Sequence, residues 1–249
     1  MKKFIIAIIS IVFCLPLIIQ AQDAADFKPF SFGLKAVPSI SFIKSEVKDF
    51  ENANPSLNFG YGLIAEFNFA PNYGLLTGVE INDNSGNVDY NLNAAKILYF
   101  PEGDTVPFYI QSRKYKIKYL NVPILLKLKT NEIGFLKYYG QFGIDAGFRL
   151  KARAIDEGLD SGKVNVSIKE DVNIDKDVSL IRLGLNIGGG VEWNLSGTTS
   201  VVIGLNYSNC FTNFLKKESY NLQVEQTGRP WLKQDAYNNY IALTLGILF

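Results

Sequence analysis

Charged residues within alternating apolar segments are the part of this sequence best suited to chemistry. The eight that we single out are Lys35, Glu66, Glu80, Lys127, Asp145, Arg149, Arg182 and Glu192. Four of these residues are basic and four are acidic. Lys129 follows Lys127 at the spacing that places both side chains on one face of a strand. Opposite charges that share a narrow interior should pair with one another. We therefore predict an ion-paired structural core, and the alternative is a path for protons or ions.

The residue types of a hydrolytic site are incomplete, because the chain contains no histidine. Imidazole is the side chain whose ordinary pKa lies near neutrality, and familiar hydrolases of membrane barrels use it as the general base. No nucleophile and base can be recognised here by their spacing. We predict a non-enzymatic protein with no catalytic residues. An enzyme that uses an acidic residue or lysine as its base is the less favoured alternative.

No cofactor or metal site is predicted from the remaining motifs. The glycines at 188–190 lack the lysine and the hydroxyl residue that complete a phosphate-binding loop. The acidic stretch 156–177 does not follow the spacing of a calcium-binding loop. Cys210 would be the one cysteine left after removal of a leader, which excludes an internal disulfide and a cysteine zinc site.

The N-terminus has the composition of an export signal. Lys2 and Lys3 precede an apolar run, Phe4–Ile19, and a short polar junction that contains Ala21. The run is shorter than the roughly 20 residues of a membrane-spanning helix, and Pro16 interrupts it. We predict a signal peptide at residues 1–21, and the alternative is a retained inner-membrane anchor.

Residues 22–249 are expected to form one domain, because they contain no linker or low-complexity stretch. Without the two lysines of the leader, 23 basic residues face 24 acidic ones. Such a balance argues against nucleic acid as the partner.

Alternation with a period of two dominates this domain, and no long window has apolar positions at helical spacing. The alternating segments predict eight strands: Phe30–Ala36, Leu57–Phe69, Tyr73–Ile81, Tyr115–Lys129, Tyr138–Leu150, Ile181–Trp193, Val201–Ser208 and Ile241–Phe249. One face of each segment is apolar, whereas the other carries glycine and charge. In the segment Tyr115–Lys129 the polarity of the two faces reverses near Tyr119, which predicts a bulge or the membrane rim at that position.

The connections between these segments alternate strictly in length. The short ones are 70–72, 130–133 and 196–199, and the long ones are 44–56, 82–114, 151–177 and 209–236. Outer-membrane barrels have short periplasmic turns, long extracellular loops and strands of about ten residues. We predict an all-β fold, an eight-stranded antiparallel transmembrane β-barrel in the outer membrane of a Gram-negative bacterium, surrounded by its lipid. A soluble lipocalin-like barrel, the alternative, would place apolar residues inside and charge outside.

One string in the sequence resembles a family signature. Residues 119–127, Tyr-Leu-Asn-Val-Pro-Ile-Leu-Leu-Lys, resemble the Tyr-Leu-x-Ile-Pro-Leu-Leu-Leu-Lys motif of PorT-like outer-membrane barrel proteins. The Gly-rich segment Gly184–Trp193 and the segment Tyr207–Asn213 are similar to further stretches of that family. The final Phe249 is similar to the C-terminal signal read by the barrel-assembly machinery.

This resemblance implies an outer-membrane barrel that meets the barrel-assembly machinery during its biogenesis. The namesake of the family takes part in type IX protein secretion, so secretion-apparatus proteins are expected as partners. No catalytic residues come with the family. A narrow transport or adhesion barrel without a role in secretion is the alternative function.

Overall fold

The computed structural model describes residues 28–45, 50–52, 54–90, 97–99, 108–159, 166–220, 222–224 and 234–249. The predicted signal peptide, residues 1–21, lies outside the described residues. Within them the secondary structure consists of twelve strands. No helix in this part of the chain is long and apolar enough to cross a membrane.

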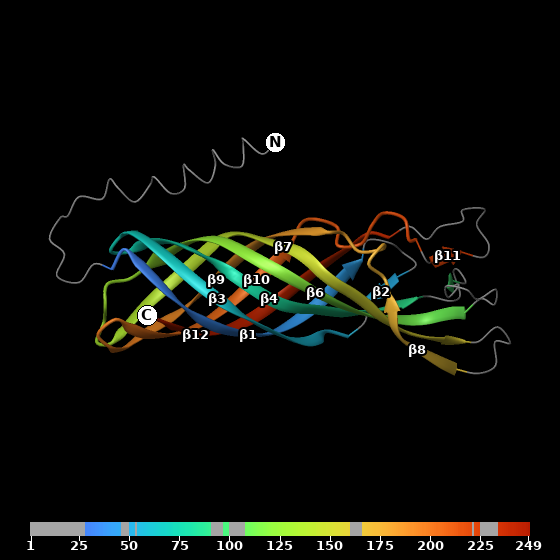
Figure 1. Ribbon diagram of the computed structural model, residues 1–249, viewed down its shortest axis with the longest axis horizontal. Coiled ribbons are helices and arrows are strands. Elements are labelled where there is room, and N and C mark those ends of the chain that lie inside the picture. Colours follow the sequence, from blue (N-terminus) through green and yellow to red (C-terminus); the bar gives the residue numbers. More distant parts are fainter. Residues whose placement is uncertain are drawn as a thin grey trace, which may run out of the picture.

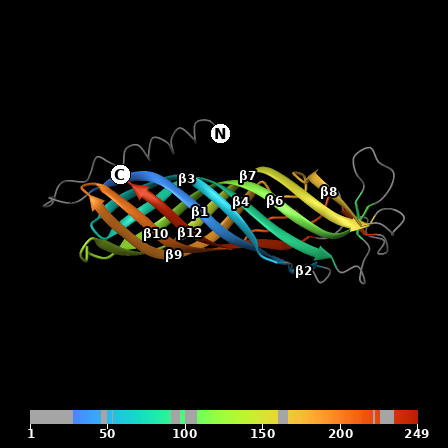
Figure 2. The ribbon, with the colours of Figure 1, turned by 90° about the horizontal axis from the view of Figure 1, so that it is seen from below.

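Eight long strands form a closed antiparallel barrel, which confirms the predicted fold class (Figures 1 and 2). They are β1 (Phe30–Ser45), β3 (Ser56–Ala70), β4 (Tyr73–Tyr90), β6 (Phe108–Lys129), β7 (Leu136–Leu159), β9 (Ile181–Ser196), β10 (Thr199–Cys210) and β12 (Ala236–Leu248). Each pairs with its neighbours in this order, and β12 pairs with β1 to close the sheet. Closure leaves no unpaired edge, the condition for a sheet in lipid.

The two ends of the barrel differ in how the strands are connected. At one end, which we call the short-turn end, residues 71–72, 130–135 and 197–198 join neighbouring strands. Gly197 has a φ of 57° there, a conformation that glycine adopts without steric cost. The opposite end, which we call the long-loop end, carries the short strands β2 (Phe50–Asn52), β5 (Ile97–Tyr99), β8 (Val166–Asn173) and β11 (Leu222–Val224) (Figure 1).

A belt of exposed apolar side chains surrounds the short-turn half of the barrel. Members of the belt from six strands are Ile40, Leu63, Ile124, Ile144, Leu185 and Leu205, each between 46% and 60% exposed. In a water-soluble protein such a continuous apolar surface would be costly, whereas in lipid it is the expected exterior. The alternation of each strand therefore places the glycine and charge of the opposite face in the lumen.

Strands β6 and β7 are much longer than a membrane requires, with 22 and 24 residues. The sequence predicted long loops at 82–114 and 151–177, and those boundaries are wrong. In the structure β4 continues to Tyr90, β6 already begins at Phe108 and β7 continues to Leu159. The strands continue because their inward side chains pack together beyond the membrane.

The reversal of polarity near Tyr119 marks the membrane rim. Tyr119 and Lys127 both point inward on β6, so the alternation of this strand is continuous from Arg113 to Lys127. The chemistry of each face changes instead: the inward side chains include charged ones toward the short-turn end and are mainly apolar toward the long-loop end. A register shift between β6 and β7 lies between Lys118 and Tyr119, where Leu150 of β7 is the additional residue. The structure thus has a bulge at the position predicted for a bulge or the membrane rim, and β7 carries it.

Beyond this level the interior of the barrel is mainly apolar. The buried cluster there consists of Ile43, Val88, Tyr90, Ile97, Tyr99, Phe108, Ile110, Tyr115, Ile117, Tyr119, Ala152, Ala154, Val172, Ile174, Val178, Phe214, Leu215, Leu222 and Ala236. We call this part of the barrel the extension. It is a second core, built like that of a soluble protein on top of a membrane barrel with a polar lumen.

Candidate functional site

A quartet of buried charges occupies the lumen near the short-turn end. Glu66 of β3 and Glu192 of β9 face Lys127 and Lys129 of β6. The Nζ atom of Lys127 lies 2.7 Å from Oε2 of Glu66 and also contacts Glu192, while Lys129 donates to Glu66. Lys127 also lies over the ring of Tyr139, 4.3 Å from its centroid. Two carboxylates and two ammonium groups thus compensate one another where water is excluded.

Glycine residues make room for this packing. A Cβ atom at Gly204 would lie only 2.1 Å from the hydroxyl oxygen of Tyr139, and one at Gly188 only 1.9 Å from Oδ1 of Asn206. Both strands bring these glycines to the lumen, as the alternation of the sequence predicted for Gly188. The large side chains opposite them therefore fill the lumen instead of leaving a channel.

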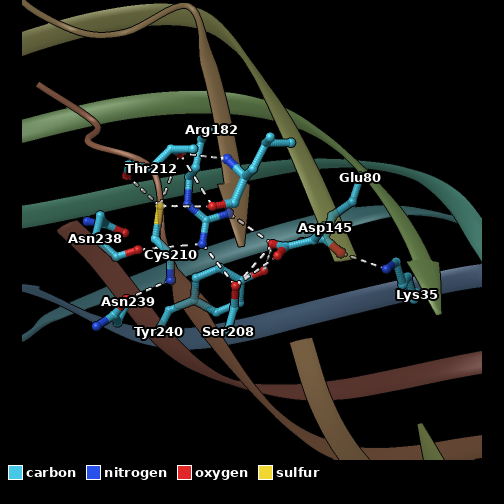
Figure 3. Close-up of polar contacts among 11 residues, drawn as sticks. Lys35, Glu80, Asp145, Arg182, Ser208, Cys210, Thr212, Asn238, Asn239 and Tyr240 are labelled. Carbon is cyan, nitrogen blue, oxygen red and sulfur yellow. Dashed lines mark hydrogen bonds and ion pairs between the residues drawn. The ribbon is translucent and has the colours of Figure 1, made fainter. Parts of the chain in front are cut away.

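A second network lies further along the lumen, around Asp145 of β7 (Figure 3). Arg182 of β9 donates from Nη1 to Oδ2 of Asp145 at 2.9 Å, and its Nη2 donates to the hydroxyl of Ser208 at 2.9 Å. The hydroxyls of Ser208 and Tyr240 donate to the same carboxylate at 3.0 and 2.9 Å. Each of these side chains forms a hydrogen bond with at least one of the others. The group therefore connects four strands, β7, β9, β10 and β12, across the lumen.

Lys35 and Glu80 form the third lumen contact, with 2.6 Å between Nζ and Oε2 (Figure 3). A cavity of about 40 Å³ lies between this pair and Asp145. Such a space admits only a few water molecules. The lumen charges consequently have partners of opposite sign and little free volume around them.

Arg149 is placed differently from the other seven predicted lumen charges. It lies half-buried on β7 at the membrane rim, next to the bulge. Its Nη1 donates to the carbonyl oxygen of Val178 at 2.7 Å and to that of Asp175. Arg149 therefore fixes the segment after β8 through backbone carbonyls, and no carboxylate of the described residues forms an ion pair with it.

The extension contains a fully buried ion pair that the sequence pattern did not predict. Arg113 of β6 and Asp156 of β7 meet through two hydrogen bonds, 2.6 Å from Nε to Oδ1 and 2.7 Å from Nη2 to Oδ2. Both side chains are 0% exposed. Both fall in segments expected to be loops, although the alternation of Arg113 with Tyr115, Ile117 and Tyr119 could have indicated an inward position.

Tyrosine rings surround this pair. The guanidinium carbon of Arg113 lies 6.0 Å from the ring centroids of both Tyr99 and Tyr115. The hydroxyls of Tyr90 and Tyr115 lie 3.3 Å apart, and burial raises the pKa of both phenols. Burial by itself would lower the pKa of Arg113, but the Asp156 carboxylate outweighs it and holds that pKa above its ordinary value.

Cys210 is buried beside the second network (Figure 3). Its Sγ lies 3.1 Å from the carbonyl oxygen of Thr212, and its backbone N–H donates to Oδ1 of Asn239 at 2.8 Å. The thiol is packed inside the barrel. In the described part of the chain no group of three or more His, Cys, Asp or Glu residues could hold a metal ion.

Comparison with known families decides the class of barrel. The sequence matches the family described as "Outer membrane protein beta-barrel domain" over residues 20–173. The chain belongs to this family. It is therefore a protein of the outer membrane of Gram-negative bacteria, as predicted.

Solved structures resemble the chain only in overall shape, and no curated protein sequence matches it. OprG from Pseudomonas aeruginosa is 13% identical, with 88% of this chain and 95% of that chain covered and a TM-score of 0.48. Ail of Yersinia pestis is 13% identical, with coverages of 89% and 100% and a TM-score of 0.35. The outer membrane protease OmpT from Escherichia coli is 10% identical, with coverages of 92% and 99% and a TM-score of 0.39.

Proposed function

We propose that this protein is a closed, non-enzymatic outer-membrane barrel that acts through protein contacts at its long-loop end. The main support is the contrast between the interior of the membrane half and the interior of the extension. The lumen is filled by paired charges together with a small cluster of apolar side chains, whereas the extension beyond the membrane is a packed core that supports a fixed surface. A barrel built for passage would need an open lumen, and a simple membrane anchor would not need the extension.

The lumen supports the first half of this proposal. The quartet around Lys127 and the network around Asp145 span opposite walls of the barrel, because β3, β6 and β9 meet in one and β7, β9, β10 and β12 meet in the other. Opening a path would separate opposite charges that are buried together. Breaking such a pair costs about 3–5 kcal/mol.

The loops at the far end support the second half. Asp177 accepts hydrogen bonds from the hydroxyl of Ser219 at 3.2 Å and from the backbone N–H of Tyr220. Asn213 accepts one from the backbone N–H of Ala236 at 2.7 Å. The Asp177 contacts join the loop after β8 to the loop after β10, and the Asn213 contact holds the loop after β10 to the start of β12. A surface that is ordered in advance loses less entropy when a partner binds.

Two exposed aromatic residues lie in the loop after β10. Phe211 directly follows the strand, where its N–H donates to the carbonyl oxygen of Leu183 in β9, and Tyr220 lies beside Asp177. Phe211 and Tyr220 are 49% and 55% exposed. Aromatic side chains contribute a large share of the free energy of protein binding. We extend the proposal to type IX secretion, because residues 119–127 resemble the PorT-like signature, and we name secretion-apparatus proteins as the partners.

The test is a comparison of secreted proteins between a strain that lacks the gene and its parent. We expect many secreted proteins to be lost together and to be restored by the wild-type gene. Complementation with the double variant Phe211→Ser/Tyr220→Ser should fail, although heat-dependent gel mobility shows that the barrel has folded. An unchanged set of secreted proteins in the deletion strain would refute the secretion role.

A matched control probes the other end of the barrel. Phe135 is 71% exposed in the turn between β6 and β7 at the short-turn end. The variant Phe135→Ser should complement fully. Failure of this variant, together with success of the double variant, would contradict the assignment of the contacts to the long-loop end.

A further inference from the structure

Five basic side chains point outward just above the apolar belt. We call them the basic rim: Lys114, Lys116 and Lys118 of β6, and Lys151 and Arg153 of β7. The apolar belt ends at Leu120 on β6 and at Leu150 on β7. The basic side chains are the next outward residues toward the long-loop end. The basic rim therefore lies at the level where a bilayer changes from hydrocarbon to headgroups.

Like charges oppose one another across the two strands of the basic rim. Lys118 pairs in register with Lys151, and Lys116 with Arg153. Like charges directly opposite on one face of a sheet destabilise it. Such an arrangement on two neighbouring pairs indicates that anions compensate the charge.

The protein itself supplies only part of that compensation. Asp83 lies 3.5 Å from the Nζ atom of Lys118, and both side chains are about half exposed. Arg153 has ion pairs with Asp171 and Asp175 at 3.4 and 3.3 Å. Among the described residues, no carboxylate lies within ion-pair distance of the other three members, Lys114, Lys116 and Lys151.

A groove of about 660 Å³ runs beside the basic rim. The three lysines of β6, Lys151 and Arg153 line it together with two carboxylates, Asp83 and Asp171, and two apolar residues at the start of β3, Leu57 and Phe59. These two side chains are 84% and 54% exposed. The groove thus offers five cationic groups against two carboxylates, and beside them bare apolar surface.

We propose that this groove binds the phosphorylated headgroup of an outer-leaflet glycolipid, with phosphate at Lys116 and Lys151 and an acyl chain against Leu57 and Phe59. The proposal requires the long-loop end to face outward, which follows from short turns being periplasmic. Basic clusters at the membrane surface recognise anionic headgroups. A soluble anion would use the lysines but would leave the apolar side of the groove bare.

The test measures binding of purified phosphorylated lipid A to the full chain in detergent micelles by native mass spectrometry. We expect the double variant Lys116→Ala/Lys151→Ala to bind about thirtyfold more weakly than the wild type, since each surface cation contributes about one factor of five. The control Lys216→Ala/Lys217→Ala removes the same charge from two exposed residues outside the groove and should bind as the wild type does. The conservative variant Lys116→Arg/Lys151→Arg should retain binding.

Two further arms identify the source of the anion. Wild-type protein should lose affinity for lipid A from which the phosphates have been removed, a comparison that needs no variant. Equal binding of the two lipids would overturn the proposal, as would equal binding by the alanine variant and its control. Displacement of phosphorylated lipid A by millimolar inorganic phosphate would instead identify a soluble anion and refute the lipid.

Discussion

The membrane half of the barrel and its extension have opposite polarity, although the same strands run through both. In the membrane half Lys127 of β6 is buried, and Ile124 on the other face of the strand is 56% exposed. In the extension Tyr115 of β6 is buried, and Lys116 is exposed. The change occurs within a few residues of Tyr119, which lies opposite the bulge of β7 at Leu150.

The difference shows that the surrounding solvent decides which face of a strand is polar. Lipid requires an apolar exterior, so a narrow barrel must place its charges inside and pair them. Water imposes no such requirement, and the extension gains stability by burying apolar side chains as soluble proteins do.

The buried ion pair of the extension should be the most sensitive position. Replacing Arg113 with leucine leaves the Asp156 carboxylate uncompensated in an apolar core, which should cost about 3–5 kcal/mol of the free energy of unfolding. Urea unfolding in micelles, followed by protease resistance of the extension, measures the loss. The double variant Arg113→Leu/Asp156→Leu should recover most of it, because the surrounding core is apolar. A double variant as unstable as the single one would argue against that explanation.

The outward face of β6 offers the sharpest test of the polarity change. Ile124→Lys places a charge against lipid and should destabilise the barrel by about 2–4 kcal/mol. Lys116→Ile, on the same face beyond the rim, should change stability by less than about 0.5 kcal/mol. Folding titrations in lipid vesicles measure both. Equal costs at the two positions would show that the rim does not lie between them.

The extension should also lose stability in alkali. Burial raises the pKa of Tyr90, so above pH ~10 the unfolded chain releases this proton while the folded protein retains it. Stability is then fully present below pH ~10 and falls above it, by up to about 1.4 kcal/mol for each pH unit. Proteolysis of the extension as a function of pH measures this loss. Tyr90→Phe should flatten the dependence, and an unchanged profile would exclude Tyr90 as its source.

The membrane half could be predicted well from the sequence. Its strands present alternating lipid and lumen faces, and this pattern located eight strands and the residues that form the lumen contacts, among them Lys127 and Asp145. The contacts of Arg149 could not be foreseen, because they depend on carbonyl groups of a loop that only the folded chain brings near. Pairing between distant strands is likewise invisible in a single sequence.

The extension was largely missed for a physical reason. Its strands are polar outside and apolar inside, as in many soluble proteins, and exposed lysines and aspartates are as typical of a loop as of such a strand. The inward residues Ala152, Ala154 and Asp156 form a weak pattern, because alanine is small and the charge has its partner on another strand. The reversal at Tyr119 was the one signal that the alternation continued beyond the membrane.

The central claim, a lumen closed by its own paired side chains, is tested most directly by ion conductance in planar lipid bilayers. Purified full-length protein should insert, as heat-dependent gel mobility verifies, and should produce no steady single-channel steps, while a porin in the same bilayer conducts. Steady, large single-channel steps from the wild-type protein would contradict a filled lumen and would favour a transport barrel.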